Sequence, residues 1–239
     1  MDTLPSFSRS GDNRLVLAAV GGGGKTSCLT LLAQRNRARG RSVLLTTSTH
    51  MRRTALVNCS PSLPALRQQL EQSGFLFAGT PAVPGKIGPL PEAQYDSLSR
   101  LAQVTLVEAD GSRGLPLKMP APWEPVLPKR TDFVLVLLGL SGLGQPLSQV
   151  CHRWALAAQA LSCPADRTVT PELAARLLEL GYLGPLKAAG LPFAVVLNQG
   201  DTVPPAWGDA LKQLLAPTPA YVVSLKRELE KFPPLELRD

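Results

Sequence analysis

The sequence predicts an α/β fold of three layers, in which helices cover both faces of a mostly parallel β-sheet. Two observations carry this prediction. Short apolar segments alternate with helix-like segments along all 239 residues. The apolar segments also lack the polar–apolar alternation of a half-exposed strand, as expected for strands buried on both faces. Because 44% of the residues are hydrophobic, a large core is available, and we expect a single domain over residues 1–239.

The first βαβ unit lies near the start of the chain. Residues 14–20, RLVLAAV, form an apolar run that predicts a buried strand, and four glycines follow it. The segment 26–39 places apolar residues at helical spacing, and Gly40 is a good C-terminal stop. Residues 42–47, SVLLTT, predict the second strand. Strand, glycine turn, helix and strand together make one βαβ unit.

The same alternation continues to the end of the chain. Further strands are expected at residues 104–110, 132–140, 193–198 and 220–225. Helices are expected at residues 63–73, 91–103, 153–162, 171–180 and 205–216, with a short one at the end. Thr170 precedes one of these helices as its predicted N-cap. Proline-rich stretches near residues 58–91 and 114–128 are predicted insertions, the first an extended loop after its helix.

The glycine run continues into Lys and Thr, in the segment AAVGGGGKTSCL at residues 18–29. A Walker A loop reads G-x-x-x-x-G-K-[ST], and only its first glycine is absent, replaced by Ala19. Glycines allow backbone N–H groups to converge on phosphate oxygens at the start of a helix. A simple hinge would need neither Lys25 nor Thr26. The fold is therefore expected to be P-loop NTPase-like, with a phosphate site at Gly21, Gly22, Gly23, Gly24, Lys25, Thr26 and Ser27.

Acidic residues follow the third strand, in LVEADGSRG. A Mg²⁺–nucleotide site needs an acid at the end of a neighbouring strand, and Asp110 is our preferred candidate. In the alternative, Glu108 takes the metal-linked role and Asp110 orients water. Thr26 and Thr47 are expected to complete the Mg²⁺ shell, with Thr49 as the alternative to Thr47. Arg113 is a candidate internal arginine finger, and Lys25 and the two acids are the other candidate catalytic residues.

The base is predicted from VVLNQGD, which follows the fifth strand. Asn198 and Asp201 have the N-x-x-D spacing of many P-loop GTPases, in which the aspartate accepts two hydrogen bonds from guanine. Gln199 replaces the usual lysine. The expected cofactors are Mg²⁺ with GTP or ATP, and GTP is favoured.

Several stretches together give the chain a resemblance to the bacterial YqeC-type family, regarded as accessory proteins of selenium-dependent hydroxylases. They are VGGGGKTS, TTSTHM, VEADGSRGLPLKMPAPWEPVLP, GLGQPLSQVCHR and VVLNQGD. The resemblance implies a nucleotide-binding protein linked to the maturation of molybdenum hydroxylases. Its partners would be such a hydroxylase or the proteins that insert its cofactor. The family pattern has a histidine before the Glu-Pro pair, where this chain has Trp123.

Charge and composition restrict the partners. The net charge of +7 favours anionic ligands, but aromatic residues make up only 5% and no single-strand-binding face is evident, so nucleic acid is not expected. The four cysteines form no C-x-x-C pair. No apolar run is long enough to span a membrane, and a cytoplasmic location is expected.

Two classes of function compete with a nucleotide hydrolase that acts as a maturation switch. One is a small-molecule kinase or ligase, with an acceptor site in the proline-rich loops. The other is a non-catalytic nucleotide sensor. The roles of three residues stay open. His50 is either a site or a structural histidine; His152 faces the site or caps a helix that opens at residues 151–153; Cys151 is a sulfur or selenium handle or a buried thiol.

Overall fold

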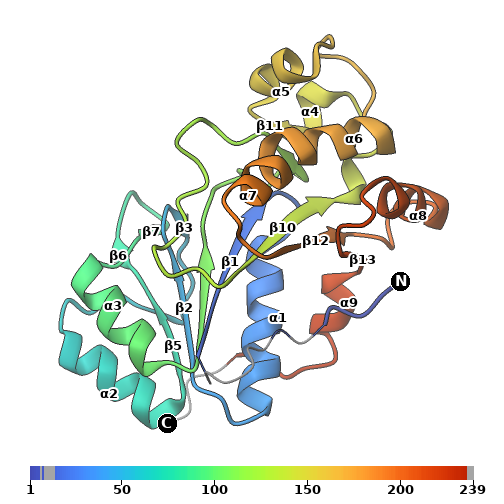
Figure 1. Ribbon diagram of the computed structural model, residues 1–239. Coiled ribbons are helices and arrows are strands. Elements are labelled where there is room, and N and C mark those ends of the chain that lie inside the picture. The colour runs from blue at the N-terminus through green and yellow to red at the C-terminus, as the bar shows by residue number, and fades with distance from the viewer. Residues whose placement is uncertain (6, 8–13, 236–239) are drawn as a thin grey trace.

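The computed structural model describes residues 1–5, 7 and 14–235, and its centre is an eight-stranded sheet (Figure 1). The strand order is β13–β12–β10–β1–β8–β2–β5–β4, and every neighbouring pair is parallel. The strands are β1 Leu15–Gly21, β2 Val43–Thr47, β4 Val57–Asn58, β5 Phe75–Ala78, β8 Val104–Glu108, β10 Phe133–Gly139, β12 Phe193–Asn198 and β13 Ala220–Val222. The predicted α/β class is confirmed.

Helices cover both faces of this sheet, because its strands are apolar on both sides. Successive residues of β1, Leu17 and Ala18, point to opposite faces and belong to different hydrophobic clusters. The cluster of Leu17 includes side chains from α1 Lys25–Ala38 and α9 Leu225–Leu229. The opposite face is covered by two groups of helices (Figure 1). They are α2 Leu63–Ser73 and α3 Glu92–Leu101 over β2 and β5, and α6 Pro171–Leu178, α7 Gly184–Ala188 and α8 Pro205–Leu214 over β10 and β12.

Small elements lie around the carboxyl edge of the sheet. Three short strands form an antiparallel sheet: β3 Met51–Arg52, β6 Thr80–Pro81 and β7 Lys86–Gly88. Two more, β9 Leu117–Lys118 and β11 Cys151–His152, pair in parallel. The remaining helical elements are a 3-10 turn at Leu140–Gly142, α4 Leu147–Val150, α5 Trp154–Leu161 and a π-helical turn at Glu179–Leu183. The segment after β8 lies beside the glycine loop, because the Leu115 carbonyl accepts from the Gly23 N–H, and β11 is joined to this segment through β9.

Several local expectations are confirmed and others are corrected. The helix at residues 63–73 and the strand at 193–198 have the predicted bounds, and the Thr170 hydroxyl caps α6 by accepting from the Leu173 N–H. The helix expected to open at residues 151–153 begins only at Trp154, because Cys151 and His152 pair with β9. The region 58–91 is more than a loop, since Phe75–Ala78 forms a buried strand of the main sheet.

The described part of the chain holds no helix with the length and apolar character that crossing a lipid bilayer would require.

Candidate functional site

The glycine loop joins the end of β1 to the start of α1 at the carboxyl edge of the sheet. Gly21, Gly23 and Gly24 have φ angles of 95°, 79° and 119°, in the left-handed region that favours glycine. A Cβ atom on Gly23 would lie 2.2 Å from the Gly139 nitrogen, and one on Gly21 would lie 2.2 Å from the Leu137 oxygen. The loop is therefore packed against β10 so closely that side chains are excluded at these two positions.

Lys25 is the first residue of α1, and its side chain folds back over the loop. Its Nζ donates to the Gly21 carbonyl at 2.6 Å and lies 3.2 Å from Asp110 Oδ1. The side chain is only 3% exposed. The ammonium group is thus held at the mouth of the loop, where the first N–H groups of a helix also attract anions.

Asp110 is completely buried and receives contacts from four groups. Its carboxylate accepts from the Gly21 N–H at 3.1 Å and from the Tyr182 hydroxyl at 2.8 Å, and it lies within 3.2 Å of the Nζ atoms of Lys25 and Lys118. Two ammonium groups therefore neutralise it inside the protein. Asp110 joins the glycine loop to β9 and to the π-helical turn.

Glu108, rather than Asp110, reaches the threonine of the loop. The Thr26 hydroxyl donates to Glu108 Oε2 at 2.7 Å. Burial raises the pKa of Glu108, although Lys25 and the Thr26 hydrogen bond oppose this shift. On the neighbouring strand, the Thr47 hydroxyl donates to the backbone oxygen of Glu108 at 2.8 Å, so it supports that residue and does not contact its carboxylate.

Asn198 connects three segments of the site. Its Nδ2 donates to the Gly23 carbonyl at 2.7 Å, and its Oδ1 accepts from the N–H of Leu225, the first residue of α9. Asp201 belongs to an exposed turn, but its side chain is only 19% exposed and its carboxylate lies 3.4 Å from Arg227 Nε. Gln199 has a φ of 64°, and its Oε1 accepts from Ser141 at 2.7 Å, so it turns towards β10.

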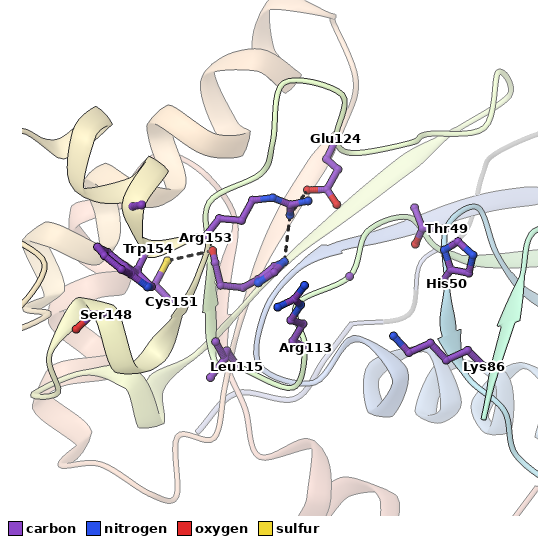
Figure 2. Close-up of a pocket in the computed structure, with 13 residues that line it drawn as sticks. Thr49, His50, Lys86, Arg113, Leu115, Glu124, Ser148, Cys151, Arg153 and Trp154 are labelled. Carbon is purple, nitrogen blue, oxygen red and sulfur yellow. Dashed lines mark hydrogen bonds and ion pairs between the residues drawn. The ribbon is translucent and has the colours of Figure 1, made fainter. Parts of the chain in front are cut away.

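A cavity of about 620 Å³ is lined in part by Leu115, whose carbonyl accepts from the Gly23 N–H of the glycine loop (Figure 2). Figure 2 shows Arg113 between Thr49, His50 and Lys86 on one side and Cys151 and Trp154 on the other. Glu124, His152 and Arg153 also line the cavity. The cavity also reaches Cys151, whose thiol is buried and has a pKa raised by burial to about 12. Such a thiol is protonated at neutral pH. This disfavours the possibility that Cys151 carries sulfur or selenium.

Two residues of this region, Tyr182 and Glu124, were not predicted from the sequence. Tyr182, 72 positions from Asp110, bonds to it, and Glu124 bridges Lys118 and Arg153 at 3.0 and 2.8 Å. Lys118 is fully buried in the same ion-pair chain, between Asp110 and Glu124. No local pattern marks Tyr182. The Glu-Pro pair within the proline-rich stretch was the only signal for Glu124.

The comparison with known protein families decides the relationship: the sequence profile described as "YqeC protein" matches residues 17–155, more than half of the chain. The chain belongs to the YqeC family. The match includes the glycine loop, both acids and the lining of the cavity up to Ala155.

Two individual proteins resemble this YqeC chain. The "Uncharacterized protein YqeC" of Escherichia coli strain K12 is 39% identical over 163 residues, which cover 64% of this chain. The match spans 63% of that relative, less than two thirds of its length. The septum site-determining protein MinD of Pyrococcus horikoshii OT3, solved as a complex with Mg-ADP, is 15% identical, with a TM-score of 0.47 over 92% of this chain and 87% of that one.

Proposed function

We propose that the chain binds a Mg²⁺–nucleoside triphosphate at residues 21–27 and hydrolyses it. The observation that carries this proposal is the contact between Thr26 and Glu108, 2.7 Å long, beside Lys25 at the first turn of α1. A hydroxyl on the loop and a carboxylate on the adjacent strand are the pair of groups that a nucleotide-bound Mg²⁺ requires. The hinge alternative gives no reason for this pairing.

The donor set fits the proposed ligands. Hydroxyl and carboxylate oxygens suit Mg²⁺, which takes few protein ligands and completes its shell with water and phosphate. Bound Mg²⁺ would neutralise phosphate charge. Thr26 and Glu108 would hold it, while Lys25 and the N–H groups of the loop would hold the phosphates.

The contacts also give Glu108 and Asp110 different roles in this proposal. In this proposal Glu108 takes the metal-linked role that Asp110 was preferred for, and Thr47 orients the Glu108 backbone. Asp110 keeps Lys25 over the loop by pairing with its ammonium group at 3.2 Å. Arg113 is exposed and lies two residues before Leu115, whose carbonyl accepts from the Gly23 N–H, and we retain it as the candidate that stabilises charge on the terminal phosphate.

Guanine remains the favoured base within this proposal. Both polar atoms of the Asn198 side chain are used to hold the glycine loop and α9 together, which makes it a positioning residue. Reading the base then falls to Asp201, whose side chain is partly exposed and whose carboxylate can accept from the two N–H groups on one edge of guanine. Comparing the dissociation constants of GDP and ADP tests this part, because equal affinity for both would exclude guanine selection.

The biological context is proposed from the family resemblance. It is that of an accessory factor in the maturation of molybdenum hydroxylases with a selenium-containing cofactor, and the stretch VEADGSRGLPLK supports it. The test is genetic. Cells that lack this protein should lose selenium-dependent hydroxylase activity, and a copy carrying Lys25→Ala should fail to restore it. Normal hydroxylase activity in the deletion strain would exclude this context.

The biochemical proposal is tested by titrating non-hydrolysable analogues of GTP and ATP with and without Mg²⁺, and then by measuring phosphate release. We expect binding that Mg²⁺ strengthens, followed by slow turnover. Tight binding without turnover would indicate a sensor. The cavity lined by His50, Lys86 and Arg113 lies next to the loop. Transfer of phosphate to a small molecule bound there is therefore the second candidate. It would appear as a phosphorylated product in place of free phosphate.

A further inference from the structure

The cavity beside the glycine loop has a strongly basic lining. Lys86 and Arg113 are exposed, Arg153 is half-buried, and the two histidines of the described chain, His50 and His152, also line it (Figure 2). These side chains come from segments far apart in the sequence and face one shared space.

The single acidic side chain of this lining is already neutralised. Glu124 Oε2 lies 3.0 Å from Lys118 Nζ and 2.8 Å from Arg153 Nη1. Among the described residues that line the cavity, no other carboxylate offsets Lys86 or Arg113. Burial lowers the pKa of His152, and nearby Arg153, Lys118 and Arg113 lower it further, which reflects the positive potential of this wall.

Both arginines of the cavity lining are held in an unfavourable backbone conformation. Arg113 has a φ of 54° and Arg153 a φ of 60°, although neither is glycine, asparagine or aspartate. Backbone strain of this kind persists where the surrounding structure imposes it, and it concentrates at functional sites. In the folded chain this backbone conformation places the side chains of Arg113 and Arg153 at the same cavity.

Apart from Arg113, which is also the candidate for the terminal phosphate, the cavity is separate from the residues proposed to hold the nucleotide. Residues 21–27, Asn198 and Asp201 do not line it. It nevertheless touches the loop, because Leu115 lines the cavity while its carbonyl accepts from the Gly23 N–H at 3.1 Å. A ligand here would lie next to the phosphate loop without competing for its N–H groups.

We infer that this cavity binds a second ligand, a small anion with phosphate or carboxylate groups, through Arg113, Lys86 and Arg153. Arginine suits this chemistry, since its planar guanidinium group pairs with both kinds of oxygen anion. The inference goes beyond the proposed nucleotide site. The two share Arg113, but Lys86 and Arg153 belong to the cavity alone, so each proposal can fail without the other.

The test uses pyrophosphate and citrate as probes for the two anion chemistries. Each is titrated by calorimetry into the full chain carrying Lys25→Ala, which disables the glycine loop. Arg113→Ala and Lys86→Ala are then added singly. Arg67→Ala is the matched control, because it removes the same charge from an exposed position on α2 outside this cavity. Thermal unfolding of each variant confirms that it is folded.

We expect at least one probe to bind the Lys25→Ala protein, and Arg113→Ala or Lys86→Ala to weaken that binding by about fivefold or more. Arg67→Ala should change it less than about twofold. Binding of pyrophosphate alone would identify a phosphorylated ligand, and binding of citrate alone a carboxylate. The inference is overturned if neither probe binds, or if Arg67→Ala weakens binding as much as the cavity variants. Anion binding without any nucleotide binding by the unmodified protein would instead reject only the nucleotide proposal.

Discussion

Glu108 and Asp110 are two residues apart, yet their surroundings give them different chemistry. Asp110 is enclosed by two ammonium groups, a tyrosine hydroxyl and a backbone N–H. Glu108 contacts Thr26, which is exposed at the loop surface. A carboxylate that already has four partners is poorly placed to take a fifth, whereas the partner of Glu108 is one that a metal can also use.

Replacement of Glu108 by Gln should selectively reduce the Mg²⁺-dependent part of nucleotide affinity. The amide keeps the shape of the side chain but cannot supply a negative charge. We expect a loss of about tenfold or more with Mg²⁺ and little change in EDTA, measured by calorimetry. Equal losses in both conditions would contradict the metal-linked role.

The same residue predicts a pH dependence. Because burial raises the pKa of Glu108, the carboxylate becomes protonated above its usual pH range. Mg²⁺-dependent nucleotide affinity should therefore fall as the pH is lowered through that raised pKa, and Glu108→Gln should abolish the trend. The folded state binds this proton more readily than the unfolded state does. The contribution of Glu108 to stability hence decreases as pH rises from the usual to the raised pKa.

Asp110→Asn should act mainly on stability. Removing this charge leaves the buried ammonium group of Lys25 without an ionic partner and Lys118 with Glu124 alone. We expect a loss of about 3 kcal/mol in the free energy of unfolding, measured by urea denaturation at neutral pH. Glu179→Gln, which breaks the half-exposed pair with Lys187, is the control and should cost less than about 1 kcal/mol. Similar costs for both would mean that the buried cluster is not a structural centre.

At the scale of elements, the glycine loop depends on backbone conformation as much as on side chains. Gly23→Ala introduces a Cβ atom 2.2 Å from the Gly139 nitrogen at a φ of 79°. We expect a loss of at least about 2 kcal/mol in the free energy of unfolding, together with weaker nucleotide binding. Gly111→Ala is the matched control, because nothing lies within 4 Å of its added Cβ. A stable Gly23→Ala protein with full affinity would show that the loop geometry is not required.

The sequence was most informative where an element is long and its environment uniform. The apolar runs of β1, β8, β10 and β12 are buried on both faces and were predicted within two residues. Phe75–Ala78 was missed because it is short and directly follows Gly74, the C-cap of α2. Cys151 and His152 were assigned to a helix because their strand exists only by pairing with β9.

Some contacts of the candidate site could likewise be predicted from the sequence, and others could not. Residues after parallel strands share one sheet edge, so the meeting of the glycine loop with residues 108–110 could be predicted. The contact of Tyr182 with Asp110 joins positions 72 apart, and the choice between Glu108 and Asp110 depends on where β8 ends. Such contacts follow from tertiary packing, which local patterns do not record.

At the scale of the whole molecule, burial should divide the four cysteines into two classes. Cys28 and Cys151 are buried, and burial raises the pKa of both thiols to about 12. Cys59 and Cys163 are half-buried. A thiol reagent at neutral pH should therefore modify Cys59 and Cys163 first, as peptide mass spectrometry can measure, and the other two only on global unfolding. Rapid modification of Cys28 in the native protein would contradict the packing of α1 on the sheet.

The central claim is that the glycine loop of this YqeC chain binds the phosphates of a nucleotide through Lys25. The most direct measurement is calorimetric titration of a non-hydrolysable GTP analogue, and of its ATP counterpart, with Mg²⁺ into the unmodified protein and into Lys25→Ala. Asp110 keeps Lys118, Tyr182 and the Gly21 N–H as partners in the variant, so its circular dichroism spectrum should be unchanged. The account predicts binding by the unmodified protein and a loss of about 100-fold or more in the variant. Equal affinity in both proteins, or no binding by either, would contradict it.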